Sequence, residues 1–170
     1  MNPAARRPIQ LTVGESLTTV TSRLFEAGDL RALYAIEEAC FTPEVRFSRA
    51  LMRSLVEDAN TRTWLGIAEG VRAGFAIVGL RTEQDESSAY IWTIEVLPAF
   101  RRMGVARELL ARVEDSASQA GCTAIELHVS EQNLDALTLY VAAGYERVGV
   151  EPGYYGHGVA GFRYRKVLAA

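Results

Sequence analysis

The sequence contains 170 residues, of which 49% are hydrophobic and 23% charged, and its formal net charge is -3. This length and composition predict one globular domain with a sizeable core, and the charge argues against a surface for duplex nucleic acid. No apolar run approaches the roughly 20 residues that span a bilayer, so we expect a cytoplasmic protein without a membrane partner.

The first residues and the two cysteines carry little functional signal. Residues 1–16 include Arg6 and Arg7 but no apolar stretch after them, so we expect a flexible tail and no secretory signal. Residues 17–170 are expected to form a single domain. Cys40 and Cys122 lie far apart without a partner motif, which indicates a reducing compartment, buried thiols and neither a disulfide nor a metal site.

Alternating or helical spacing of apolar residues predicts five elements in the first half of the chain. In chain order they are a strand at 17–25, a helix at 28–41, a helix that Ser48 caps and Asn60 ends, and two strands at 63–70 and 72–81. A turn at 69–71 joins the last two strands into a hairpin. The polar stretch at 82–88 predicts a loop.

The second half begins with a strand at 89–97 that is apolar on both faces, which is typical of the centre of a sheet. Pro98 ends this strand, and a helix follows from Gly104 to Gly121. Next comes an alternating strand at 123–129. A strand, a helix and a strand within about 40 residues predict a right-handed crossover between parallel neighbours.

Two more strands close the chain after a short helix. Asn133 is placed to cap that helix, which covers 134–145. The strands at 146–151 and 161–168 then flank a glycine-rich loop at 152–160.

The turn between the strand at 89–97 and the next helix has the composition of an anion site. Arg101 and Arg102 precede the helix, Gly104 lets a phosphate approach the backbone, and Ala106 keeps the first helical turn thin. The turn is neither a Walker loop nor a dinucleotide fingerprint. An ordinary connection with two solvated arginines is the alternative that the turn alone leaves open.

Two blocks of sequence together resemble the GNAT superfamily of acyl-CoA-dependent N-acetyltransferases. The family's pyrophosphate loop has Arg or Gln, two residues, Gly, one residue, then Gly or Ala, and Arg101, Gly104 and Ala106 fit it. The second block matches the family's pattern of Asn, Ala, Leu-Tyr and Gly-aromatic at Asn133, Ala136, Leu139, Tyr140, Gly144 and Tyr145.

The resemblance implies an α/β fold with a mixed, mostly antiparallel central sheet, helices on both faces and a splayed pair of parallel strands. It also implies that acetyl-CoA is the cofactor and that pantetheine enters the gap between the splayed strands. The N–H of Val96 would then lie against the thioester as an oxyanion donor, which is worth roughly 3 kcal/mol in the transition state. The cofactor-binding residues that it implies are Val96, Arg101, Arg102, Met103, Gly104, Val105, Ala106, Asn133 and Tyr140.

A closer resemblance is to the protein amino-terminal acetyltransferases, including those that act on a ribosomal-protein alanine. His128 stands where those enzymes have a general base, with Tyr90 as a second base or water holder, and Tyr140 is implied to protonate the leaving thiolate. Tyr154 and Tyr155 resemble the loop that binds the first residues of the substrate. Core packing is the alternative reading for His128, Tyr90 and Tyr140. Glu95 and Glu126 are fallback bases, and His157 is expected to be exposed.

The chemistry of the amine favours an α-amino acceptor. With reference pKa values of about 7.8 for an α-amine and 10.4 for lysine, deprotonation at pH 7 costs about 1 kcal/mol and nearly 5 kcal/mol. An imidazole acting through water suits the first task. We therefore expect direct acetyl transfer to a protein or peptide amino terminus. The alternatives are acetylation of a small-molecule amine and a catalytically silent acyl-CoA-binding module.

Overall fold

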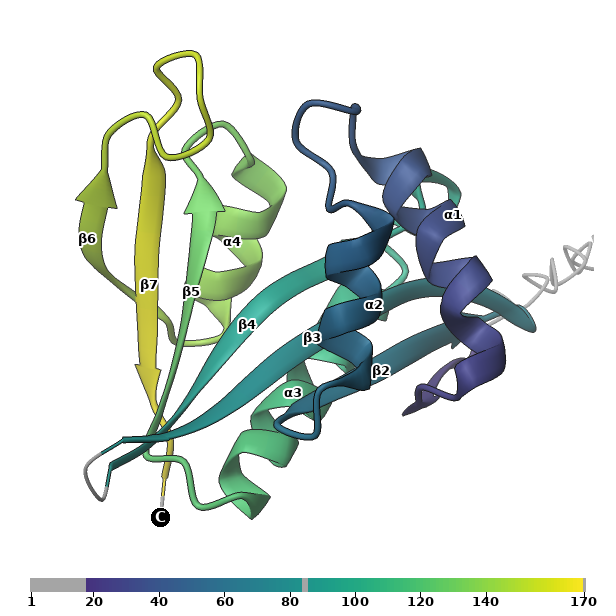
Figure 1. Ribbon diagram of the computed structural model, residues 1–170, viewed down its shortest axis with the longest axis horizontal. Coiled ribbons are helices and arrows are strands. Elements are labelled where there is room, and N and C mark those ends of the chain that lie inside the picture. The colour runs from purple at the N-terminus through teal and green to yellow at the C-terminus, as the bar shows by residue number, and fades with distance from the viewer. Residues whose placement is uncertain (1–17, 84–85, 170) are drawn as a thin grey trace, which may run out of the picture.

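A computed structural model describes residues 18–83 and 86–169, so the expected tail at 1–16 lies outside the described residues. Within them, seven strands form one sheet in the order β1-β2-β3-β4-β5-β7-β6, with helices on both faces (Figure 1). The strands are β1 (Val20–Leu24), β2 (Thr61–Ala68), β3 (Val71–Glu83), β4 (Glu86–Val96), β5 (Ala124–Ser130), β6 (Glu146–Glu151) and β7 (Gly161–Val167). The helices are α1 (Leu30–Cys40), α2 (Arg49–Glu57), α3 (Val105–Gln119) and α4 (Leu134–Ala142), with short 3-10 turns η1 (Ala27–Asp29) and η2 (Pro98–Phe100).

The sheet is mixed and mostly antiparallel, as predicted. β4 and β5 are parallel, with α3 as their crossover, and the other neighbouring pairs are antiparallel. The pairing of β4 with β5 runs from Ser88 opposite Ala124 to Ile91 opposite Leu127. This confirms the predicted parallel pair, and it leaves residues 92–96, nearly half of β4, without β5 as a partner.

A bulge in β4 marks the point where the two parallel strands part. Ile77 of β3 pairs with Thr93 and Val78 pairs with Ile91, so Trp92 is an extra residue on β4. A bulge bends its strand and increases the local twist. Figure 1 shows β4 and β5 diverging toward their carboxyl ends, beyond this position.

Two apolar cores lie on opposite faces of the sheet. One is formed by α3 and α4 against the central strands, with Leu109, Val113 and Ile125 fully buried. The other packs α1 and α2 against β2 and β3 through Leu33, Met52 and residues such as Phe75. Burial of these apolar side chains fixes the helices and so sets the ends of the strands that border the site.

Local signals predicted several helix ends, but α2 ends at Glu57 and not at Asn60 as expected. Ser48 Oγ accepts a hydrogen bond of 3.1 Å from the N–H of Leu51, and Asn133 Oδ1 accepts one of 3.2 Å from the N–H of Ala136. Gly121 follows α3 with a φ of 77°, a left-handed conformation that favours glycine.

Two expectations were wrong in detail. The stretch at 82–88 is not all loop, because Thr82 pairs with Ser87 and Glu83 with Glu86, which extends both strands of an exposed hairpin. Polar residues are compatible with a strand end that faces water on both sides. Cys122 is buried, but Cys40 is only partly buried because it lies at the end of α1.

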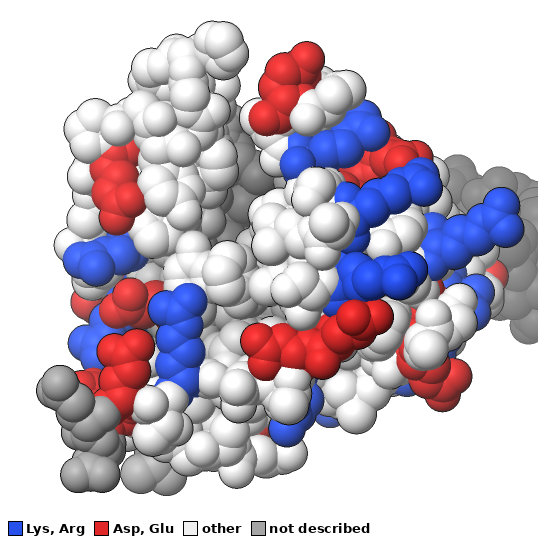
Figure 2. Space-filling model, in the orientation of Figure 1, with Lys and Arg blue, Asp and Glu red and all other residues white. Residues whose placement is uncertain are grey.

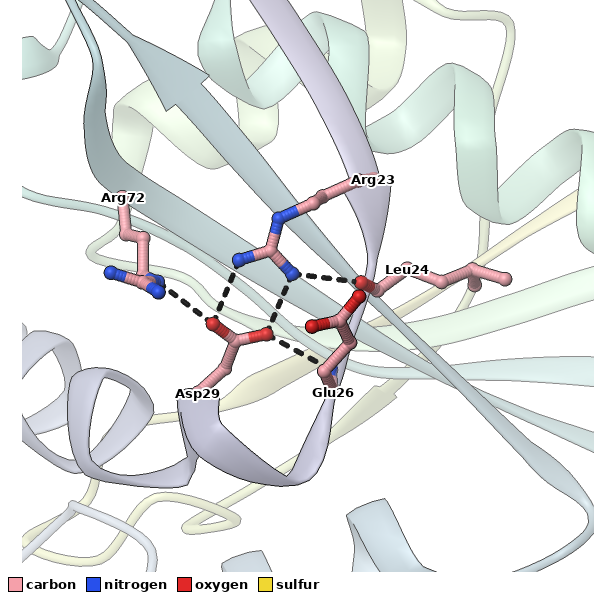
Figure 3. A network of polar contacts seen from close by, with 5 residues as sticks. All are labelled: Arg23, Leu24, Glu26, Asp29 and Arg72. Atoms are coloured by element: carbon pink, nitrogen blue, oxygen red, sulfur yellow. Dashed lines mark hydrogen bonds and ion pairs between the residues drawn. The ribbon is translucent and has the colours of Figure 1, made fainter.

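A buried aspartate joins the start of α1 to the edge of the sheet (Figure 3). Asp29 accepts two hydrogen bonds from Arg23 of β1, at 2.7 and 2.8 Å, and one of 2.8 Å from Arg72 of β3. It also accepts one of 2.9 Å from the N–H of Glu26. The bond with Arg23 lowers the pKa of Asp29 well below its usual range, against the opposing effect of burial.

Candidate active site

The end of β4 presents backbone groups to the gap beyond the bulge. The N–H of Leu97 donates to Ala73 of β3 at 2.8 Å. Because successive N–H groups of a strand point to opposite edges, the N–H of Val96 points away from β3, toward the side where β5 has separated. The Val96 carbonyl faces the same way and accepts hydrogen bonds from Arg101 Nε at 3.1 Å and Cys40 Sγ at 3.4 Å.

The turn before α3 has the backbone conformation of an anion-binding loop. Arg102 and Gly104 both have positive φ, of 62° and 89°. Among the described residues, no oxygen accepts a hydrogen bond from the N–H groups of Met103, Gly104, Val105 or Ala106. Left-handed residues at the start of a helix gather such N–H groups into a concave site, which the helix dipole makes more favourable for anions.

The two arginines of this turn differ in their placement. Both are exposed, but Arg101 turns back to donate a hydrogen bond to the Val96 carbonyl, whereas Arg102 makes no such bond in the part of the chain that the structure describes. The predicted pyrophosphate loop is therefore assembled around backbone N–H groups with Arg102 free to reach an anion. Arg101 joins the loop to the strand end.

The second sequence block places Tyr140 in the apolar core below the gap. Tyr140 lies on α4, is 6% exposed, and packs edge to face on Tyr145 at 5.5 Å between ring centroids. Burial raises the pKa of Tyr140, so the phenol stays protonated at neutral pH. Asn133 uses its side-chain oxygen to cap α4, which is a structural role that leaves its amide nitrogen available.

Tyr90 and His128 face each other across the parallel strands. The Tyr90 hydroxyl lies 2.8 Å from Nδ1 of His128, which is a hydrogen bond. Burial, and then the neighbouring Tyr154, raise the pKa of Tyr90. The Arg81 guanidinium lies over the Tyr90 ring, 5.6 Å from its centroid. The two predicted bases therefore form one connected unit.

The tyrosines of the loop between β6 and β7 cover this unit. The ring of Tyr154 stacks on His128 at 4.5 Å between centroids and 7° between planes, and Tyr155 packs edge to face on Tyr154. Gly161 leaves room for Tyr154, since a Cβ there would lie 2.8 Å from its Cγ. Burial raises the pKa of Tyr155 to about 12. His157 is exposed on the same loop, as expected.

Two residues near the site were missed or given another role by sequence reasoning. Glu151, the last residue of β6, accepts a bond from Nε2 of His128 at 3.0 Å. Glu95 is 3% exposed beside Glu37 of α1, and burial first, then the Glu37 carboxyl, raise its pKa. Both effects favour the neutral form of Glu95, and Thr93 Oγ1 donates a hydrogen bond of 2.7 Å to its carboxyl. Glu126, the other fallback, pairs with Arg165 at 3.4 Å.

The surrounding surface is open between the two halves of the molecule. Figure 2 shows a hollow between the part that contains β5, β6 and β7 and the part that contains α1 and α2. None of the helices in the described part of the chain is long and apolar enough to cross a membrane.

Comparison with known proteins identifies the family. The model of the acetyltransferase (GNAT) family matches residues 30–145, which include the loop before α3 and Tyr140. The chain belongs to this family. The match confirms the resemblance on which the acetyltransferase reading depends.

Sequence relatives of this GNAT protein have different acceptors in their names. The aminoglycoside N(6')-acetyltransferase type 1 of Salmonella typhimurium is 32% identical over 97 residues, which cover 54% of this chain and 67% of the relative. Another match, to a Mycobacterium leprae protein, covers 38% of this chain and only 17% of that protein's length.

Solved structures share the GNAT fold over almost the whole domain. The ribosomal-protein-S18-alanine N-acetyltransferase of Escherichia coli has a TM-score of 0.77 and 22% identity, covering 89% of this chain and 96% of that one. NAA60 of Arabidopsis thaliana, in complex with a bisubstrate analogue, has a TM-score of 0.77 and 20% identity, covering 88% and 98%. At this identity the likeness establishes the fold alone.

Proposed function

We propose that the protein transfers the acetyl group of acetyl-CoA directly to the α-amino group of a protein or peptide. The observation that carries this proposal is the 2.8 Å hydrogen bond between Tyr90 and His128 at the divergence of β4 and β5. This contact supports a proton acceptor on the edge toward which the Val96 N–H points. The structures of NAA60 and yncA with acetyl-CoA support the choice of cosubstrate.

The residues present fit acetyl-CoA on structural grounds. The free N–H groups from Met103 to Ala106, at the start of a 15-residue helix, are suited to the pyrophosphate. The end of β4 lacks β5 as a partner, which leaves the N–H of Val96 able to donate a hydrogen bond to the thioester oxygen. Acetyl-CoA, when bound there, supplies the activated acyl carbon.

The chain's own groups then manage two protons. The ammonium form of the acceptor loses one proton to the Tyr90–His128 unit, and its free electron pair forms the C–N bond. Val96 donates to the oxyanion that develops, which stabilises the transition state. As the C–S bond breaks, Tyr140 donates its proton to the sulfur, and the second proton of the nitrogen restores the Tyr140 hydroxyl.

The choice of an α-amine depends on the strength of this base. Removing a proton at pH 7 costs about 1 kcal/mol for an α-amine and nearly 5 kcal/mol for a lysine. An imidazole is well matched to the smaller cost. Tyr154 and Tyr155 are placed to close over the first residues of an extended peptide, since they cover the base from the β6–β7 loop.

The test compares initial rates on two matched peptides. One has a free amino terminus, and the other is blocked there but contains one lysine. We expect the first to react faster with the wild-type protein, and His128→Ala to reduce that rate about 100-fold. Faster acetylation of the blocked peptide would refute the α-amine acceptor.

A second candidate function is acetylation of a small-molecule amine, which the 32% identity to the aminoglycoside acetyltransferase favours. The variant Tyr154→Ala separates the two. It should weaken peptide use more than acetyl-CoA use if the loop binds a peptide. Activity on aminoglycosides or polyamines, with none on either peptide, would establish the second candidate.

A further inference from the structure

His128 is held through both nitrogens of its ring, and only one of these contacts belongs to the base described above. Nδ1 meets the Tyr90 hydroxyl at 2.8 Å, and Nε2 meets Oε1 of Glu151 at 3.0 Å. Glu151 lies on β6, separated from β5 by β7. Glu151 is the register partner of Gly161 on β7, and His128 is the register partner of Arg163, two residues along the same strand.

The hydrogen bond between His128 and Glu151 determines which atom is the donor in the hydrogen bond between His128 and Tyr90. A carboxylate only accepts hydrogen bonds, so Nε2 must carry the hydrogen. In the neutral ring Nδ1 then has the free electron pair, and the Tyr90 hydroxyl must be the donor. The opposite tautomer would place a hydrogen on Nδ1 and leave His128 unable to take the Tyr90 proton.

We propose that Glu151 is a positioning residue that holds His128 in the Nε2–H tautomer, so that Nδ1 receives the proton of Tyr90. The inference rests on the proposed transfer to an amine. In the step, the N–H bond of the ammonium breaks and its proton moves to the Tyr90 oxygen while the Tyr90 proton moves to Nδ1. The imidazolium that forms donates through Nε2 to the Glu151 carboxylate, and it later returns one proton to water.

Among the charged groups near His128, Glu151 is the one placed to hold the Nε2–H tautomer. Tyr154 covers one ring face, and Arg163 of β7 is the register partner of His128. Glu126, two residues away on β5, is paired with Arg165. Glu151 is thus the carboxylate in contact with the ring among the described residues. Its side chain is 48% exposed, so its effect on charge is screened and its effect on the tautomer is the larger one.

The first test reads the tautomer without any substrate. The chain has two histidines, so ¹⁵N labelling of histidine with a His157→Gln variant assigns the signals of His128. We expect the Nε2–H tautomer in the wild-type protein and a mixture in Glu151→Ala. Glu146→Ala is the matched control, because it removes an exposed carboxylate from the other end of β6.

The second test follows the rate against pH for the same variants on the free-amino-terminus peptide. Glu151→Ala should lower the plateau about tenfold, since only part of the protein keeps the productive tautomer. It should also move the rising limb to lower pH, because removing a negative charge eases proton loss from the imidazolium. Glu151→Asp should keep part of the wild-type plateau rate and part of the wild-type pH dependence. Glu146→Ala should change neither the plateau nor the rising limb.

The outcomes separate the two proposals. An Nδ1–H tautomer in the wild-type protein, or an unchanged tautomer and unchanged rate profile in Glu151→Ala, would overturn the role of Glu151. A lower plateau rate in Glu151→Ala, with the rising limb at the same pH and the His128 tautomer unchanged, would also overturn it. That pattern indicates a general loss of structure. If the wild-type protein acetylates no amine, the proposed function fails, and the tautomer measurement still decides the role of Glu151.

Discussion

Replacing Asp29 by Asn should cost about 3 kcal/mol of the free energy of unfolding. The asparagine keeps the shape of the side chain but removes the charge that faces two guanidinium groups. Asp29 is 2% exposed, whereas the Arg23 and Arg72 side chains are 37% and 49% exposed. Water screens the arginines, so we assign about 1 kcal/mol to each pair and about 1 kcal/mol to the contact with the N–H of Glu26.

This sum lies at the lower end of the cost of removing one partner from a buried ion pair, which is about 3–5 kcal/mol. For a protein of this size, 1 kcal/mol corresponds to about 2–4 °C in the melting temperature. We therefore expect Tm to fall by about 6–12 °C. Urea unfolding at pH 7 measures the free energy directly, and Asp115→Asn is the control because its pair with Arg112 is exposed and 3.6 Å long.

The pH dependence gives the sharper check. The folded pKa of Asp29 is lowered relative to the unfolded chain, so its contribution is present above the unfolded pKa of about 3.9. That contribution is lost as pH falls toward the folded pKa. The difference between wild type and Asp29→Asn should therefore shrink from pH 7 to pH 3. An equal difference at both pH values, or a loss below 1 kcal/mol at pH 7, would refute the reasoning.

Two further predictions concern the cofactor and the leaving group. Gly104→Glu should abolish acetyl-CoA binding by calorimetry, because it adds a negative charge at the loop as well as about 1–2 kcal/mol of left-handed strain. Gly104→Ala has the strain alone, and equal affinities for the two variants would contradict an anion site. Tyr140→Phe should lower kcat about 100-fold with little change in acetyl-CoA affinity, since the loss arises in the transition state. Tyr145→Phe is the control from the same core, and an unchanged kcat for Tyr140→Phe, with chemistry rate-limiting, would remove Tyr140 from this role.

Features that depend on near neighbours in sequence could be predicted. The caps at Ser48 and Asn133 and the parallel crossover through α3 follow from local composition and spacing. The bulge at Trp92 could not be predicted, because it exists only in the register of β4 against β3. The insertion of β7 between β5 and β6 likewise depends on pairing between distant segments.

The same distinction applies to the candidate site. The loop at Gly104 and the residues Tyr90 and His128 could be proposed from the sequence because they lie inside short sequence blocks. Glu151 was not found, because it is an exposed carboxylate at a strand end, 23 residues from His128. Nothing in its neighbourhood of the sequence marks it. It meets His128 only after β7 has turned back between the two strands.

The buried pair of Glu37 and Glu95 bears on where the acceptor's proton goes. Glu37 Oε1 accepts a bond from the N–H of Phe47 at 2.6 Å, and Thr93 donates to Glu95 at 2.7 Å. Two ionised carboxylates at this depth would repel each other and lack water, so the raised pKa keeps a proton on Glu95. Glu37 thus bonds the α1–α2 connection through Phe47, and Glu95 bonds its own strand through Thr93. Because this arrangement favours the neutral form of Glu95, we expect the amine's proton to pass to Tyr90 and His128, which are in contact with the partly exposed carboxylate of Glu151.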